Sequence, residues 1–205
     1  MKTIKGPFAL AVFVLALSFA MSGITHSQDG VYMIDSAHSQ VIFKVKHLAI
    51  STVTGSFDQF EGSYKFDAEN IDGSSVETTI VASSINTNDE ERDEHLASKD
   101  FLDVEKFPNI VFKSKEIKKI EGKKFQIVGD LTIHGVTKEV TLDAVYEGHI
   151  ASDPWGKERT AFIANGTINR KDFGMTWNKA LELGGFVVGD EVRITLEVEG
   201  IRNKS

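Results

Sequence analysis

The chain has 205 residues, a length that favours one domain with an appended segment. It contains no cysteine, which excludes disulfides, thiolate metal sites, a catalytic thiol and the lipidated cysteine of a bacterial lipoprotein. Its formal net charge is −7, so the chain as a whole repels the phosphates of nucleic acids, and we expect no nucleic-acid partner.

The first element along the chain is a predicted secretory signal peptide at residues 1–27. Lys2 and Lys5 precede an apolar run from Phe8 to Ala20, and small and polar residues follow. This run is too short to cross a bilayer of about 30 Å as a stable helix. Cleavage would remove two of the 23 basic residues and none of the 30 acidic ones, which gives a mature charge of −9. We therefore expect a periplasmic or secreted protein in which residues 28–205 form one domain.

Most of residues 28–205 alternate apolar and polar side chains with period two, which predicts β-strands. The clearest runs are 41–46, 125–133, 140–146 and 191–199, and weaker runs cover about 30–35, 56–67, 74–83, 109–115 and 159–169. Gly122 and Gly135 stand in short connections between runs, where glycine tolerates a positive φ. The sequence therefore predicts eight or nine strands, mostly joined as antiparallel hairpins.

Residues 86–105 depart from this alternation. Thr87 or Asn88 can cap a helix, and Glu90 or Glu91 can close a capping box three residues later. Acidic residues at the start of a helix also suit its dipole. We expect a short helix near residues 89–97.

Eight or more antiparallel strands with one apolar face each must either stack as a sandwich or close into a barrel. Closure removes both exposed edges of the sheet. A barrel of eight strands is just wide enough to be filled by side chains or to hold one small ligand. The predicted fold class is therefore all-β, a closed antiparallel barrel, and periodicity leaves open whether its interior is filled or hollow.

Reactive side chains form no catalytic or metal-binding motif that the sequence reveals. There is no G-x-S-x-G elbow, no H-E-x-x-H pair, no Walker loop and no dinucleotide fingerprint. The histidines beyond residue 27 show neither the i, i+4 nor the i, i+2 spacing of a ligand pair, and they are His38, His47, His95, His134 and His149. We expect no catalytic residue, no metal site and no cofactor.

Four segments, in this order, resemble the YceI-like family of exported bacterial proteins. They are YMIDSAHSQVIFKVKHLAISTVTGSFDQFEG (32–62), RDEHLASKDFLDVEKFPNIVFKS (92–114), GDLTIHGVTKEVTLD (129–143) and DPWGKERTAFIANGTINRKDFGMTWN (153–178). The resemblance covers essentially all of residues 28–205. It implies a lipocalin-like barrel with a long apolar tunnel that binds a polyisoprenoid or another long-chain amphiphile.

If the barrel is such a tunnel, the inward apolar side chains line it. Our candidates for the lining are Val41, Phe43, Val45, Phe60, Ile80, Phe112, Leu131, Leu142, Phe162, Trp177, Ile194 and Leu196. Trp155 and Trp177 are expected to shape a rim or to plug an end.

The sequence leaves three functions open. The first is a non-enzymatic barrel that sequesters, transports or stores an isoprenoid lipid, with transient membrane contact and with a homodimer that covers the apolar rim. The second is an enzyme acting on a lipid-like substrate, with Asp35, His38 or His47 as acid or base, and it needs two titratable groups pointing into the interior. The third is a filled barrel with a structural or stress-related role, whose internal void would be too small for an alkyl chain.

Overall fold

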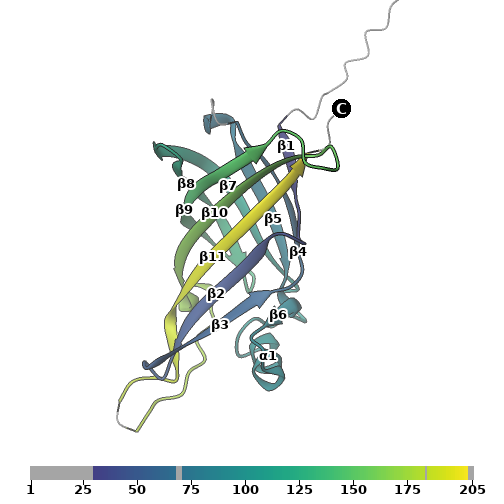
Figure 1. Cartoon of the computed structure of the whole chain (residues 1–205). Coiled ribbons are helices and arrows are strands. Elements are labelled where there is room, and N and C mark those ends of the chain that lie inside the picture. Colours follow the sequence, from purple (N-terminus) through teal and green to yellow (C-terminus); the bar gives the residue numbers. More distant parts are fainter. Residues whose placement is uncertain (1–29, 68–70, 183, 203–205) are drawn as a thin grey trace, which may run out of the picture.

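A closed antiparallel β-barrel makes up most of the computed structural model, which describes residues 30–67, 71–182 and 184–202 (Figure 1). The predicted signal peptide lies outside the described residues. The strands are β1 (Val31–Ile34), β2 (Gln40–His47), β3 (Ser51–Phe57), β4 (Phe60–Lys65), β5 (Ser75–Val81), β6 (Ile85–Asn86), β7 (Asn109–Glu121), β8 (Lys124–Ile133), β9 (Val136–Ile150), β10 (Glu158–Asn169) and β11 (Val188–Arg202). One α-helix, α1 (Glu90–Ala97), and three 3-10 helices, η1 (Ile71–Gly73), η2 (Ala82–Ser84) and η3 (Arg170–Phe173), complete the described elements.

Eight strands close the ring in the order β1-β4-β5-β7-β8-β9-β10-β11, and β11 pairs back with β1. The edge of β11 also pairs with β2, which in turn pairs with β3, and β3 pairs with β6. Because β1 and β2, β3 and β4, and β5 and β6 follow one another in the chain, each of these pairs acts as one interrupted strand. This is why eleven strand segments form a barrel for which the sequence predicts eight or nine.

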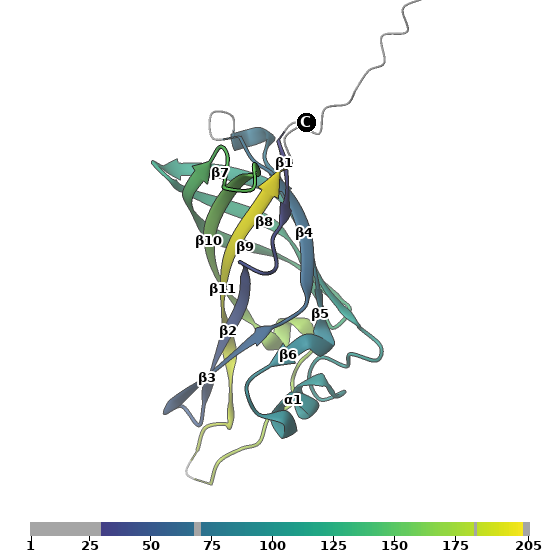
Figure 2. The ribbon, with the colours of Figure 1, turned by 45° about the vertical axis from the view of Figure 1, so that its right-hand side comes forward.

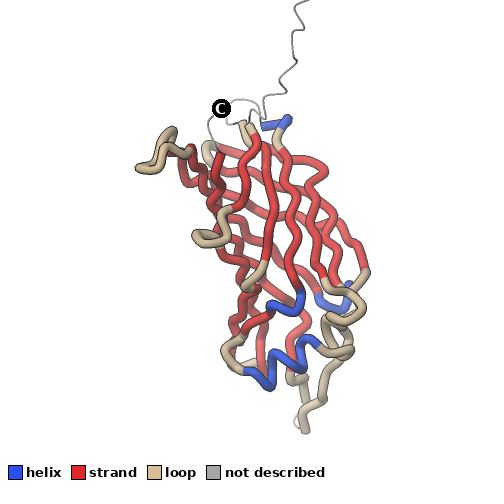
Figure 3. The backbone as a smooth tube through the Cα atoms, turned by 90° about the vertical axis from the view of Figure 1, so that its right-hand side faces the viewer, coloured by secondary structure: helices blue, strands red, loops and turns tan. Residues whose placement is uncertain are grey.

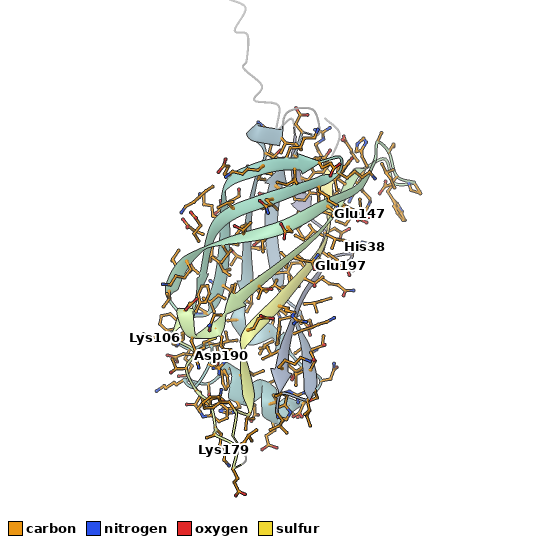
Figure 4. The ribbon with its side chains drawn as sticks, turned by 90° about the vertical axis from the view of Figure 1, so that its left-hand side faces the viewer. His38, Lys106, Glu147, Lys179, Asp190 and Glu197 are labelled. Carbon is orange, nitrogen blue, oxygen red and sulfur yellow. The ribbon has the colours of Figure 1, made fainter. Side chains whose placement is uncertain are left out.

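The strands extend further than the alternating runs. β9 and β11 have 15 residues each, which at about 3.3 Å per residue is roughly 50 Å of chain. The predicted run 56–67 was wrong in one respect, because it joins the end of β3 to β4 and misses most of β3. The long strands make the barrel taller than it is wide (Figure 3), and outward polar side chains such as Glu147 and Glu197 cover its outer surface (Figure 4).

The predicted helix is confirmed as α1, but its predicted cap is wrong. Asp89 is the N-cap, and its side chain accepts the backbone N–H of Arg92. Thr87 donates its backbone N–H and its hydroxyl to Asp93 instead. α1 lies beside β6 at one end of the barrel, which we call the helix end, and the C-terminal end of β11 lies at the opposite, terminal end (Figures 1 and 2). Among the described residues, no helix is both long and apolar enough to span a bilayer.

The seam between β1 and β11 is short, with Met33 opposite Ile201 and Ile34 opposite Gly200. Glu158 of β10 reinforces it, because its carboxylate accepts hydrogen bonds from Tyr32 Oη (2.6 Å) and from Arg202 Nε (3.0 Å). His149 Nε2 lies 2.8 Å from the same carboxylate. One side chain, 10% exposed, thus links β1, β9, β10 and β11.

We expect this carboxylate to make the barrel sensitive to acid. Burial alone would raise the pKa of Glu158, but the hydrogen bonds from Tyr32, Arg202 and His149 outweigh it and hold the pKa at about 2, below its ordinary 4.5. As the pH falls, the carboxyl group of Glu158 therefore takes up a proton in the unfolded chain before it does so in the folded chain. The stabilisation that the ionised carboxylate gives to the fold is complete above pH 4.5 and is lost as the pH falls towards 2.

Urea denaturation at a series of pH values measures this dependence. Glu158→Gln should be less stable than the native chain at neutral pH and should show a shallower loss of stability between pH 4.5 and 2. The matched control is Glu191→Gln, at a side chain that is 59% exposed, and it should keep the native slope. An unchanged slope in Glu158→Gln would contradict the assignment.

Candidate functional site

The lumen of the barrel holds an apolar cavity of about 350 Å³, which we call the main cavity. Its wall comes from strands around the ring and, at the helix end, from α1 and the neighbouring loops. Small-molecule sites in proteins commonly measure roughly 300–1,000 Å³. The inward apolar side chains therefore leave a ligand-sized space, and the filled barrel left open by the sequence is not what the structure shows.

Eleven of the twelve predicted lining residues lie on the wall of the main cavity: Val41, Phe43, Val45, Phe60, Ile80, Phe112, Leu131, Leu142, Trp177, Ile194 and Leu196. Phe162 does not, and it lines a second cavity of about 80 Å³ nearer the terminal end. Trp155 lines neither cavity, because it lies 77% exposed in the connection between β9 and β10. That any of these residues contacts a ligand stays a prediction.

Two aromatic rings of the main cavity each pack closely against a glycine of the neighbouring strand. A Cβ atom on Gly55 would come within 2.4 Å of Phe43 Cζ, and one on Gly129 would come within 2.5 Å of Phe112 Cζ. Each ring therefore occupies the space that a side chain on the neighbouring strand would fill. Because glycine permits this close approach, large aromatic residues can face the lumen without closing it.

Gly55→Ala is expected to destabilise the protein by about 1–3 kcal/mol and to narrow the main cavity, because the new methyl group must displace the Phe43 ring. Thermal unfolding measures the loss, and Phe43→Leu in the same chain should recover part of it. Gly148→Ala is the matched control, since a Cβ atom there meets nothing within 4 Å. Equal effects of the two alanine substitutions would rule out this packing argument.

The rim at the helix end contains residues that are not among the twelve predicted lining residues. Arg92, His95 and Leu96 of α1 face the main cavity, as do Phe101 and Leu102 in the loop that follows. The His95 ring packs edge-on against Phe101 and Trp177, with centroid distances of 5.1 and 4.7 Å. The sequence contains only a weak indication that this helix borders a cavity, because Leu96 is the one large apolar residue in a strongly polar helix.

Arg170 of η3 links the backbone segments near the helix end through hydrogen bonds. Its side chain is 3% exposed and donates to the carbonyl oxygens of Gly189 (2.9 Å) and Trp177 (2.9 Å), to the Met175 carbonyl and to Asp190 Oδ1 (3.2 Å). One buried guanidinium thus joins η3, the loop that carries Trp177, and the start of β11.

Aromatic side chains close the lumen at the terminal end. The Phe162 ring lies 4.8 Å from Phe66, 5.2 Å from Tyr64 and 5.8 Å from Phe125, measured between centroids. Tyr64 also donates its hydroxyl to the backbone oxygen of Thr160 on β10. Burial raises the pKa of Tyr64 well above its ordinary value, so the hydroxyl stays protonated and able to donate. In the described part of the chain, packed aromatic rings therefore close the lumen towards the terminal end.

The acid–base residues considered for an enzyme do not gather in the lumen. His47 lines the main cavity, but Asp35 and His38 do not, and no carboxylate of the described residues lines it. Asp35 pairs on the outside with His38 Nδ1 at 2.9 Å and with Arg159 at 2.9 Å. Burial would raise the pKa of Asp35, but these hydrogen bonds lower it overall. Of the three residues considered, only His47 therefore lines the main cavity, where the other titratable side chains are Lys46, Arg92, His95 and Arg170.

Asp35, His38 and Glu199 place three potential metal-ligand atoms within 4.8 Å of one another. The guanidinium of Arg159, however, contacts both carboxylates directly. It already supplies the positive charge that a cation would bring, so this cluster functions as an ion-pair network.

Comparisons with known proteins agree with this architecture. The family model of the YceI-like domain matches residues 32–200. A UPF0312 protein of Yersinia enterocolitica is 42% identical over 198 residues, which cover 95% of this chain and 97% of that protein. A UPF0312 protein of Pectobacterium carotovorum is 43% identical over 170 residues, which cover 83% and 84%.

Solved structures show the same barrel. The Campylobacter jejuni YceI protein superposes with a TM-score of 0.67 at 34% identity, covering 78% of this chain and 91% of that one. A polyisoprenoid-binding domain from Saccharophagus degradans shares the fold, with a TM-score of 0.61 at 13% identity over 84% and 98% of the two chains. From the family model and the bacterial relatives, the chain belongs to the YceI-like family.

Proposed function

We propose that this protein is a non-enzymatic carrier that holds the tail of a long-chain amphiphile, foremost a polyisoprenoid, in the main cavity. The single observation that supports this most is a ligand-sized, almost wholly apolar lumen, closed by aromatic rings at one end and bordered by polar and aromatic side chains at the other. Burying each CH₂ group contributes about 0.8 kcal/mol, so a long tail gains affinity without specific contacts.

The chemistry of the wall favours carriage over catalysis. Its titratable side chains all lie towards the helix end, where Arg92 already donates its Nε–H to the hydroxyl oxygen of Thr87 at 2.7 Å. Catalysis by His47 would need a partner acid or base; the described wall offers no carboxylate, and its other histidine, His95, is packed between Phe101 and Trp177. The shared fold with a polyisoprenoid-binding domain points in the same direction.

The expected signal peptide suggests where this carrier would act. An exported carrier would shield a water-insoluble lipid while it crosses the periplasm or the exterior, and would load and release it by transient contact with a membrane. A homodimer that covers the rim is a further expectation, and the mass of the intact assembly tests it in the same experiment.

Native mass spectrometry of protein purified without detergent tests the proposal. We expect the intact protein to carry additional mass, and an organic-solvent extract of it to contain a prenyl lipid or related amphiphile. Protein freed of this lipid should take up added geranylgeraniol. No bound amphiphile together with no uptake of prenyl alcohols would overturn the proposal.

A further inference from the structure

The second cavity, which no part of the proposed function explains, lies directly beyond the main cavity. The two cavities share four wall residues, and these are Phe112, Leu142, Leu196 and Val198. Only side chains therefore separate them. The second cavity measures about 80 Å³, and most of the side chains that line it are apolar or aromatic.

Two of the shared side chains are held back against the wall. The Phe112 ring lies over Gly129, and Leu142 Cδ2 lies where a Cβ atom on Gly166 would be, at 2.5 Å. Glycine on two different strands, β8 and β10, thus withdraws a bulky residue from the boundary between the cavities. Both side chains therefore pack against the backbone of a neighbouring strand at the boundary between the two cavities.

Small side chains then give the second cavity its space. Ala144 of β9 and Ala164 of β10 are cross-strand partners, are 2% and 6% exposed, and both line it. Its far side is formed by Tyr64, Phe66, Phe125 and Phe162, the rings that close the lumen. The space therefore ends at a wall of packed aromatic rings.

We propose that the second cavity is the subsite for the distal end of the ligand's tail, and that Ala144, Ala164 and the aromatic wall set the longest chain that the barrel encloses. This inference rests on the proposed function. A tail entering at the helix end passes Phe112 and Leu142, and its end comes to rest against Phe162. Affinity should rise with chain length until the tail reaches this wall and should level off for longer chains.

The test measures dissociation constants for geraniol, farnesol, geranylgeraniol and solanesol by displacement of a fluorescent apolar probe. Ala164→Leu fills the second cavity and should weaken the longer alcohols by on the order of 10-fold, because each CH₂ excluded costs about fourfold in Kd. Geraniol, which the main cavity holds alone, should bind as it does to the native chain.

Two further variants keep the result interpretable. Ala161→Leu adds the same atoms to β10 but lines neither cavity, and it should leave the whole length profile unchanged. Phe162→Leu enlarges the second cavity and should move the levelling-off point to a longer alcohol. This opposite shift tests the subsite even if Ala164→Leu fails to fold, as circular dichroism would reveal.

The outcomes separate the subsite from the proposed function. If the native protein binds prenyl alcohols but Ala164→Leu and Phe162→Leu change all lengths equally or not at all, the subsite is refuted and the carrier stands. If the native protein binds none of the alcohols, the carrier itself fails.

Discussion

Replacing Ile194 with tryptophan is expected to weaken the binding of geranylgeraniol by on the order of 100-fold, because the larger side chain occupies lumen that the tail would otherwise fill. Ile194 lies midway along β11, is only partly buried and faces the main cavity. Losing room for three or four CH₂ groups at about 0.8 kcal/mol each accounts for this factor. Fluorescence displacement measures the affinity.

The neighbouring residue supplies the control for this experiment. Arg193 lies on the outer face of β11 with its side chain 65% exposed, so Arg193→Trp adds an indole to the same strand without entering the lumen. The affinity of Arg193→Trp for geranylgeraniol should match that of the native chain. If Ile194→Trp folds normally and binds as tightly as Arg193→Trp, the tail does not occupy the main cavity.

The largest loss of stability is expected for Arg170→Met, on the order of 3–5 kcal/mol, because it strips a buried network of its donor. The carbonyl oxygens of Gly189, Met175 and Trp177 would lose their partner, and methionine offers them none. For a domain of this size the loss corresponds to a fall in Tm of roughly 10 °C. Differential scanning calorimetry measures it.

Two companions define what Arg170 does. Arg170→Lys keeps a positive charge but cannot span several carbonyl oxygens, so it should recover only a part of the stability. Arg193→Met removes an exposed arginine that pairs with Glu191, and it should change stability by about 0.5 kcal/mol or less. Similar Tm values for Arg170→Met and Arg193→Met would contradict the role assigned to the buried guanidinium.

Local patterning was enough to predict the barrel and the inward direction of its lining residues. Alternation assigns a side chain to a face, and Val41, Phe43, Ile194 and Leu196 all face the main cavity for that reason. It does not assign a height along the lumen. Phe162 pairs with Tyr146 in the ladder, and this register places it beside the second cavity.

Three features of the structure could not be predicted from the sequence pattern. Thr87 has the right chemistry for a helix cap, but its hydroxyl donates to Asp93, and Asp89 caps α1 instead. Arg170 stands in a polar segment that is typical of an exposed turn, and its burial follows from a loop and a strand start that come later in the chain. The hollow lumen was also unpredictable from periodicity, because it depends on which ring lies over which glycine.

A crystal structure of the protein loaded with geranylgeraniol would show whether the lumen holds the tail. We expect continuous tail density that begins near Trp177, runs through the main cavity and passes Phe112 towards Phe162. A lumen that has collapsed around its own side chains, or a ligand bound only on the outer surface of the barrel, would contradict it.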